Sequence, residues 1–262
     1  MNKFLAKRYI SYLTKSRYWK GFGIHSPFVF DFVANLMREK HEYYDFQRIR
    51  SWRDVLIKKQ ETIEITEMGA GSAVSQSRKR KIGDIVSHGS IPEKYGKLMF
   101  RMVSRYSPDG ILELGTSAGI SALYLALPKH SAKVVTIEGC PNVSAVAKNT
   151  FNYFAAKNIE LLNGDFSELL PDAIKKLPSL DFVFFDGNHR KEPTLAYFNE
   201  CLKYINNNTI FVFDDIHWSQ GMEEAWQEII ANASVTVSID IFRLGIVFFR
   251  KECQKEHYVV RF

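Results

Sequence analysis

Two glycine-containing loops in the sequence have the composition of a nucleotide-cofactor site. The first is Glu67–Ser72 (EMGAGS), which follows the extended run ETIEIT, and the second is Glu113–Gly119 (ELGTSAG), which follows the residues GIL. A glycine turn lets the backbone approach a ligand closely, and the N-terminus of a following helix offers free N–H groups to that ligand. Only one of the two loops can open a nucleotide-binding unit, so the flanking sequence must distinguish them.

An acidic residue at the end of the next strand favours the second loop. In nucleotide-binding folds such a residue, about 20 positions after the glycine turn, holds the ribose of the cofactor. The strand KVVTIE ends in Glu138, nineteen residues after Gly119, whereas no apolar strand ending in an acid follows Gly71. We therefore predict the cofactor site at Glu113–Gly119. We interpret Glu67–Ser72 as a flexible turn that leads into a mobile basic loop over residues 75–82.

Strand-like and helix-like segments alternate regularly from Gly110 onward. Apolar strands separated by helices indicate a parallel sheet covered on both faces, with its ligand at the carboxyl ends of the strands. The last two strands, 235–242 and 245–250, are joined too closely to be parallel and must form an antiparallel hairpin. The predicted fold class is α/β, a Rossmann-like, doubly wound and mostly parallel sheet with a C-terminal antiparallel hairpin. The other predicted strands are 110–115, 133–138, 159–164, 181–186 and 209–214, and the predicted helices between them are 120–127, 143–156, 166–177, 194–205 and 221–231.

Residues 1–92 are predicted to be an N-terminal helical extension, and residues 93–262 the cofactor-binding core. An apolar stripe including Tyr9 and Tyr12 indicates a first helix, and Ser26 as N-cap followed by Pro27 marks the start of a second. Further helices are predicted over 44–59 and 92–106. From the topology, we expect the extension to cover the open carboxyl edge of the sheet as a cap or substrate selector.

The loop and its flanking motifs resemble those of the class I S-adenosylmethionine-dependent methyltransferases. The resemblance is carried by ELGTSAG, by the acid that ends the next strand, and by NGDF at residues 163–166, and it covers about residues 93–262. The loop lacks the middle glycine of G-x-G-x-x-G, which argues against an NAD- or FAD-linked oxidoreductase. The antiparallel terminal hairpin also matches the methyltransferase fold.

The resemblance implies a set of S-adenosylmethionine contacts. Gly115 and Gly119 would shape the turn around the methionine moiety, Glu138 would accept hydrogen bonds from the ribose hydroxyls, and Asp165 would accept one from the adenine amino group. From the residues alone, Glu138 and Asp165 could also be helix N-caps after strands, but their joint placement favours the cofactor contacts. The full set of implied cofactor-binding residues is Glu113, Gly115, Thr116, Ser117, Gly119, Glu138, Asp165 and Phe166.

Two further predicted strands end in carboxylates. Asp186 ends one strand, and Asp214 and Asp215 end the next. Three carboxylates that converge at one edge of a sheet suit a hard divalent cation such as Mg²⁺. The pattern is similar to that of the catechol-type, metal-dependent O-methyltransferases, and this resemblance implies that Asp186, Asp214 and Asp215 bind the metal. Asp215 stands where that family usually has an amide.

His189 stands at the position of the general base in the same family, which is commonly a lysine. With an unperturbed pKa of about 6.5, a histidine can take a hydroxyl proton near neutral pH. We predict His189 and Asp186 as catalytic residues. The alternative for His189 is a loop residue or a neighbour of the metal. His217 and Trp218 are candidates for the wall of the acceptor pocket.

Charge and composition limit the class of partner. Residues 1–60 carry thirteen Lys and Arg against five Asp and Glu, so an RNA methyltransferase is an alternative to an enzyme for a small hydroxylated acceptor. The Asp/Asn-Pro-Pro-aromatic motif of amino-group methyltransferases is absent, which favours an oxygen acceptor. A catalytically silent adaptor on the same fold, and a homodimer, are left open. Three scattered cysteines, no apolar run of 18 residues and no secretory signal predict a cytoplasmic protein without a membrane partner.

Overall fold

The computed structural model describes residues 3–16, 21–66 and 79–262, and the chain in it forms two compact units. We call His41–Ser179 the central unit, and Met1–Lys40 together with Leu180–Phe262 the terminal unit. These units divide the chain after residues 40 and 179. The boundary predicted at residue 93 is not tested by this division and stays a prediction.

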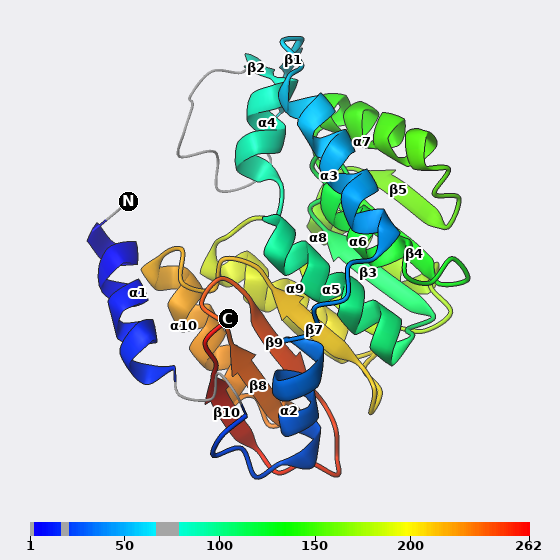
Figure 1. Cartoon of the computed structure of the whole chain (residues 1–262). Helices are drawn as coiled ribbons and strands as arrows, with labels where there is room; N and C mark the ends of the chain where they lie inside the picture. Colours follow the sequence, from blue (N-terminus) through cyan, green and yellow to red (C-terminus); the bar gives the residue numbers. More distant parts are fainter. Residues whose placement is uncertain (1–2, 17–20, 67–78) are drawn as a thin grey trace. The chain divides into compact units, whose positions relative to one another are not determined.

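The central unit is built on three parallel strands, β3–β4–β5, with β4 in the middle (Figure 1). Helices α6, α7 and α8 contact β4, and α3 and α5 contact α6. The pairing of Leu114 with Ile137 and of Glu138 with Asn163 brings the carboxyl ends of all three strands to one edge. The elements are α3 (Tyr44–Ile57), β1 (Thr62–Glu64), β2 (Lys79–Lys81), α4 (Ile82–Gly89), α5 (Glu93–Tyr106), β3 (Gly110–Leu114), α6 (Ile120–Ala126), β4 (Lys133–Glu138), α7 (Pro141–Phe154), β5 (Ile159–Asn163) and α8 (Phe166–Lys175).

The terminal unit contains strands in the order β6–β7–β9–β8–β10. β6 and β7 are parallel, β9 runs antiparallel to both β7 and β8, and every residue of β6 to β9 is buried. The predicted fold class, with its mostly parallel strands and antiparallel C-terminal hairpin, is therefore confirmed. The elements are α1 (Lys3–Lys15), α2 (Pro27–Asp31), the π-helix η1 (Phe32–Leu36), β6 (Phe182–Phe185), α9 (Lys191–Leu202), β7 (Ile210–Phe213), α10 (Gln220–Ala231), β8 (Val237–Asp240), β9 (Gly245–Phe248) and β10 (Glu256–Val259).

The start of α2 follows the predicted capping chemistry. Ser26 has an extended backbone and its side chain accepts from the N–H of Val29, while Pro27 occupies the first turn, where its missing N–H costs nothing. The apolar stripe beyond it continues as η1, in which Phe32, Val33 and Leu36 are buried. The helical N-terminus is thus present as predicted.

Several short elements escaped prediction. β10 pairs parallel with β8 at the end of the strand order, although its residues were not predicted to be a strand. β1 and β2 form a separate antiparallel pair, and α4 begins directly after β2. Lys79–Ile82 therefore belongs to regular structure, where we predicted a mobile loop. The loop Glu67–Ser72 lies outside the described residues.

Candidate functional site

The glycine loop between β3 and α6 is a tight turn in the left-handed region of backbone space. Gly115, Ser117 and Gly119 have φ values of 102°, 48° and 83°. A Cβ atom on Gly119 would lie 2.7 Å from Cε1 of Phe151, so this position requires glycine for space as well as for conformation. The N–H of Gly115 donates to the carbonyl of Ile137 at 3.0 Å, which ties the turn to the neighbouring strand β4.

Glu138, at the end of β4, is held by backbone N–H groups. Its Oε2 accepts from the N–H of Ser117 at 2.9 Å, and its Oε1 accepts from the N–H of Cys140 at 2.9 Å. Burial raises the pKa of Glu138, and these two hydrogen bonds oppose the shift. Because an ionised carboxylate offers about four acceptor positions, the two amides leave Glu138 able to accept further hydrogen bonds from a ligand.

Glu113 is a fully buried carboxyl group in the middle of the same region. Oγ1 of Thr136 donates to its Oε2 at 2.6 Å, and the Thr116 and Thr136 hydroxyls are 2.5 Å apart. Burial raises the pKa of Glu113 to about 7, against the hydrogen bond from Thr136. Its Oε1 is buried and has no hydrogen-bond partner among the residues described. A buried oxygen without a donor is costly, so this atom is suited to a ligand that brings a donor or a positive charge.

Asp165 and Phe166 lie where β5 passes into α8. Oδ1 of Asp165 accepts from the N–H of Ser167 at 2.8 Å and also from the Ser167 hydroxyl, so Asp165 is the N-cap of α8. Asn163 donates to the carbonyl of Glu138 at 2.7 Å and fixes this turn beside the end of β4. The capping role that the sequence left open is therefore present. Both bonds from Ser167 go to Oδ1, so capping does not exclude a ligand contact through Oδ2.

A second group of predicted site residues lies in the terminal unit, at the carboxyl ends of β6 and β7. Asp186 follows β6, and Asp214 and Asp215 follow β7; we call these three the carboxylate cluster. Arg243 donates two parallel hydrogen bonds to Asp214, from Nε to Oδ1 at 2.9 Å and from Nη2 to Oδ2 at 2.7 Å. Its Nη2 is also 3.7 Å from Oδ1 of Asp215.

The electrostatics of the cluster follow from burial and mutual repulsion. Burial, followed by the charge of Asp214, raises the pKa of Asp186 well above its usual range. The same two causes raise the pKa of Asp215 to about 6. Burial alone would lower the pKa of Arg243, but the charge and hydrogen bonds of Asp214, together with the charges of Asp215 and Asp186, outweigh burial and raise that pKa. Asp214 is the carboxylate that pairs directly with Arg243.

His189 lies beside Asp186, with Nε2 3.8 Å from Oδ1, and its side chain is 26% exposed. The preceding Asn188 has a φ of 54° and donates to the hydroxyl of Tyr197 at 3.3 Å, which fixes the loop. The nearby Lys191 joins α9 to α10 through Glu224 and Glu228 at 3.0 and 2.7 Å. His189 is therefore the basic side chain paired with Asp186. Lys191 pairs with Glu224 and Glu228 instead.

The predicted metal ligands do not have the arrangement of a divalent-cation site. Both oxygens of Asp214 already bind a guanidinium, which places a positive charge beside Asp214 and Asp215. Within residues 3–16, 21–66 and 79–262, no group of three or more His, Cys, Asp or Glu side chains is arranged to hold a metal ion.

Arg243 pairs with the carboxylate cluster, although it was not among the predicted site residues. It lies 29 positions after Asp214, in the turn between the two hairpin strands. A topological signal was available, because β9 runs antiparallel to β7 and Gly245 pairs with Phe213. The turn before β9 must therefore lie at the carboxyl end of β7, next to Asp214. His217, predicted as a pocket wall, instead bonds Glu223 and Asp240 at 3.0 and 2.8 Å.

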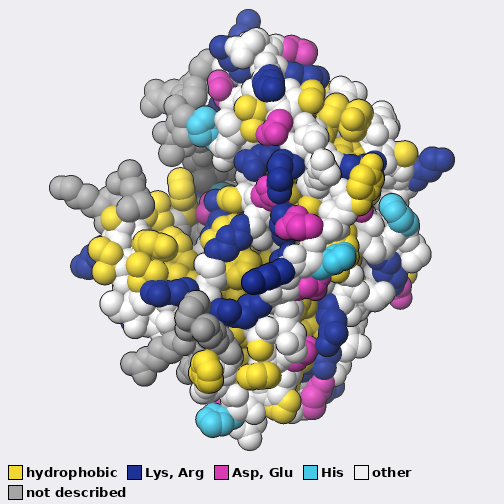
Figure 2. Space-filling model, in the orientation of Figure 1, with side chains coloured by type: hydrophobic (Ala, Val, Ile, Leu, Met, Phe, Trp, Pro, Cys, Tyr) yellow, Lys and Arg dark blue, Asp and Glu magenta, His cyan; other side chains and the backbone are white. Residues whose placement is uncertain are grey.

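Some of the basic residues near the N-terminus are paired with acidic side chains. Arg8 pairs with Glu223 at 2.6 Å, and Arg48 pairs with Asp45 at 2.8 Å. On the face shown in Figure 2, Lys and Arg side chains are interspersed with Asp and Glu. No helix among the described residues is long and apolar enough to span a membrane.

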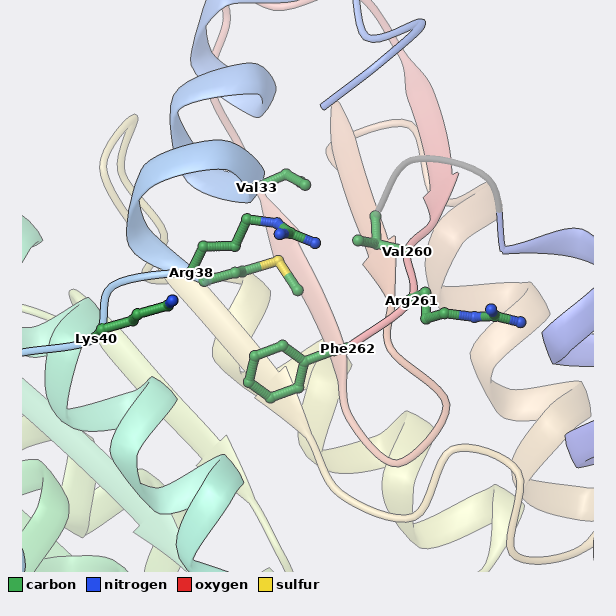
Figure 3. Close-up of a pocket in the computed structure, with 7 residues that line it drawn as sticks. Val33, Arg38, Lys40, Val260, Arg261 and Phe262 are labelled. Atoms are coloured by element: carbon green, nitrogen blue, oxygen red, sulfur yellow. The ribbon is translucent and has the colours of Figure 1, made fainter. Parts of the chain in front are cut away.

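A cavity of about 440 Å³ opens in the terminal unit between η1 and the C-terminal residues. In Figure 3, Val33 and Arg38 face Val260 across it, whereas the side chain of Arg261 points away. None of the predicted site residues lines this cavity, whose walls are Val33, Met37, Arg38, Lys40, Val260, Arg261 and Phe262.

Comparison with known proteins agrees with the motifs. Residues 112–216 match a family described as a methyltransferase domain. The chain is 29% identical over 131 residues to a catechol O-methyltransferase of Niastella koreensis, an alignment that covers 48% of this chain and 58% of that protein. The chain thus spans little more than half the length of this relative.

Solved structures share the fold. The O-methyltransferase TomG from Streptomyces achromogenes, in complex with SAM, has a TM-score of 0.55 at 21% identity and covers 62% of this chain and 82% of its own. A methyltransferase of Podospora anserina, bound to SAH, has a TM-score of 0.59 at 15% identity and covers 96% of this chain and 97% of its own. These findings confirm the predicted resemblance to class I methyltransferases of the catechol O-methyltransferase type.

Proposed function

We propose that this protein transfers a methyl group from S-adenosylmethionine to a hydroxyl oxygen of a small acceptor. The observation that carries the proposal is the fixed position of Glu138, whose carboxylate is anchored to the glycine loop by the N–H of Ser117. The match to a methyltransferase domain and the O-methyltransferase relatives support the reaction class.

The central unit would hold the methyl donor. Bound S-adenosylmethionine supplies an electrophilic methyl group on a positively charged sulfur. The turn at Gly115–Gly119 allows close backbone approach to the methionine moiety, and the unpartnered Oε1 of Glu113 suits its ammonium group. Glu138 would accept from the ribose hydroxyls and Asp165 from the adenine amino group, with Phe166 beside the ring.

The terminal unit would activate the acceptor. His189 would take the hydroxyl proton through a ring nitrogen as the oxygen attacks the methyl carbon and the carbon–sulfur bond of the donor breaks, and Asp186 would lie beside the imidazole. Methyl transfer is a direct displacement, so the protein mainly aligns the reacting atoms and removes one proton. No covalent intermediate is required, which agrees with the burial of Cys140 and Cys201.

Calorimetric titration with S-adenosylmethionine tests the donor site. Wild-type protein should bind it, and Glu138→Ala should weaken binding by about ten- to a hundredfold, because hydrogen bonds to a charged group contribute about 1.5–3 kcal/mol. The matched control is Glu160→Gln, which changes a strand carboxylate whose partners are Lys133 and Lys176 on the surface. Its affinity should equal that of the wild type.

A lack of binding by the folded wild-type protein would remove the proposed function. Equal weakening by Glu138→Ala and Glu160→Gln would instead remove the assigned role of Glu138. A screen of small phenols and other hydroxylated compounds, with transfer of a labelled methyl group as the readout, then identifies the acceptor class.

A further inference from the structure

We propose that Arg243 takes the place of a divalent cation in the carboxylate cluster, so that this chain organises its acceptor site without a metal ion. The inference deepens the proposed function, because the same carboxylates would position the acceptor and His189. Arg243 is a positioning residue in this assignment, since it acts through Asp214 and Asp215.

The pairing of Arg243 with Asp214 uses both oxygens of the carboxylate. Two parallel bonds of 2.9 and 2.7 Å form the planar fork that guanidinium and carboxylate groups prefer. The side chain of Asp214 is only 1% exposed, so this carboxylate is shielded from water and from salt, whereas the Arg243 side chain is 30% exposed. A metal ion bound to the same carboxylate would lie next to this fixed positive charge and would be repelled by it.

Asp215 extends the same arrangement. Its backbone lies in the left-handed region, at a φ of 53°, and its Oδ1 is 3.7 Å from Nη2 of Arg243. One guanidinium therefore faces two adjacent carboxylates from the same side. This is the charge-balancing task that a bound cation performs where several carboxylates converge.

The turn that carries Arg243 is anchored to the aspartate-bearing turn itself. The N–H of Ile216 donates to the carbonyl of Arg243 at 3.3 Å. Asp240 accepts from the N–H of Phe242 at 2.7 Å through one oxygen, and its other oxygen lies 2.8 Å from Nε2 of His217. His217 thus links the turn after β7 to the turn between β8 and β9.

Phe242, next to Arg243, has a φ of 72°, which is unfavourable for a residue other than glycine. Such a conformation persists only where the surroundings hold it. The rings of Tyr9 and Tyr12 on α1 contact the Phe242 ring at centroid distances of 5.0 and 5.3 Å, and His217 stacks on it at 5.4 Å. Arg243 therefore belongs to a turn whose backbone conformation is held by these ring contacts.

Titration with Mn²⁺, followed by electron paramagnetic resonance, tests the proposal directly. The wild-type protein should show no saturable site in the micromolar range, and millimolar Mg²⁺ should leave its thermal midpoint unchanged. Arg243→Met should gain Mn²⁺ affinity by on the order of tenfold or more, because one positive charge is removed from beside the carboxylates. Added Mg²⁺ should then raise the thermal midpoint of Arg243→Met.

Two variants complete the design. Arg250→Met removes a cation of the same unit whose partner is Glu252 at 2.8 Å, and this control should gain no Mn²⁺ site. Arg243→Lys keeps the charge without the fork and should exclude Mn²⁺ as the wild type does. If Arg243→Met does not fold, Arg243→Lys and the wild-type titration still decide the question.

Stoichiometric micromolar Mn²⁺ binding by the wild type, lost in Asp214→Asn, would overturn the inference. So would an Arg243→Met protein that folds and binds Mn²⁺ no better than the wild type. Calorimetry with S-adenosylmethionine separates this result from the proposed function: absence of donor binding removes the function, whereas the Mn²⁺ result concerns the cation alone. With the acceptor in hand, wild-type turnover should be insensitive to EDTA, and a loss of turnover in EDTA would count against the proposal.

Discussion

The glycine-loop region of the central unit and the carboxylate cluster of the terminal unit hold their acidic side chains in different ways. Glu138 is held by backbone N–H groups of two adjoining turns, and Asp165 by the first turn of its own helix. Asp214 is held by the side chain of Arg243, which comes from a separate hairpin. Backbone amides keep a carboxylate in place and leave it free to bind a ligand, whereas a guanidinium fork neutralises it. The first region is thus suited to binding and the second to a fixed electrostatic environment.

If the terminal unit removes the acceptor proton, replacement of His189 should have the largest effect on the reaction. His189→Gln should lower the rate of methyl transfer about 100- to 10,000-fold, as expected for loss of a general base, while affinity for S-adenosylmethionine stays unchanged. Single-turnover kinetics and calorimetry measure the two effects. His25→Gln, an exposed histidine of the same unit, is the control. A normal rate, or weakened donor binding, would break the division of roles.

Removal of Asp214 should show how strongly the cluster depends on its ion pair. Asp214→Ala leaves the Arg243 guanidinium without its main partner and should lower the free energy of unfolding by about 3 kcal/mol. Urea denaturation measures this effect. Glu252→Ala removes the exposed partner of Arg250 and should be indistinguishable from the wild type. Similar losses in both variants would mean that the buried pair has no special role.

The pH dependence of stability tests the buried carboxyl of the glycine-loop region. Because the folded-state pKa of Glu113 is about 7, above its ordinary value of 4.5, the folded state holds this proton more tightly. The contribution of this proton to the free energy of unfolding is complete below pH 4.5. It is lost as the pH rises through 7, and the loss is about 3 kcal/mol at most. Glu113→Gln should remove this loss, so the difference between the two proteins should grow from pH 5 to pH 8 in urea denaturation. A constant difference would contradict the burial argument.

The smallest expected effect concerns the shape of the glycine loop. Gly119→Ala introduces a Cβ at positive φ and against Phe151, and should cost about 1–2 kcal/mol of stability together with weaker donor binding. Gly89→Ala is a matched control, because its Cβ would make an ordinary contact at 3.5 Å with Oγ of Ser117. Thermal unfolding compares the two. An equally stable Gly119→Ala would show that the turn tolerates other residues.

The sequence predicted features that depend on neighbouring residues. β4 has the bounds that its apolar run indicated, and the start of α2 has the predicted Ser26 cap. The spacing from Gly119 to Glu138 spans one helix and one strand, so a local pattern sufficed to place the acid beside the loop. β10 could not be found in this way, because its pairing with β8 depends on a contact between separate segments.

The sequence by itself determined that acidic residues lie at the ends of the strands and that a glycine turn follows the first strand. Only the tertiary structure decided what those acids face. In the central unit they face the amides of the turns that follow them, and this arrangement follows from local chain geometry. In the terminal unit, an antiparallel strand return brings Arg243 to Asp214 across 29 positions, and no periodicity or spacing records such a contact. Long-range pairing therefore places the Arg243 guanidinium beside two of the three expected metal ligands, Asp214 and Asp215.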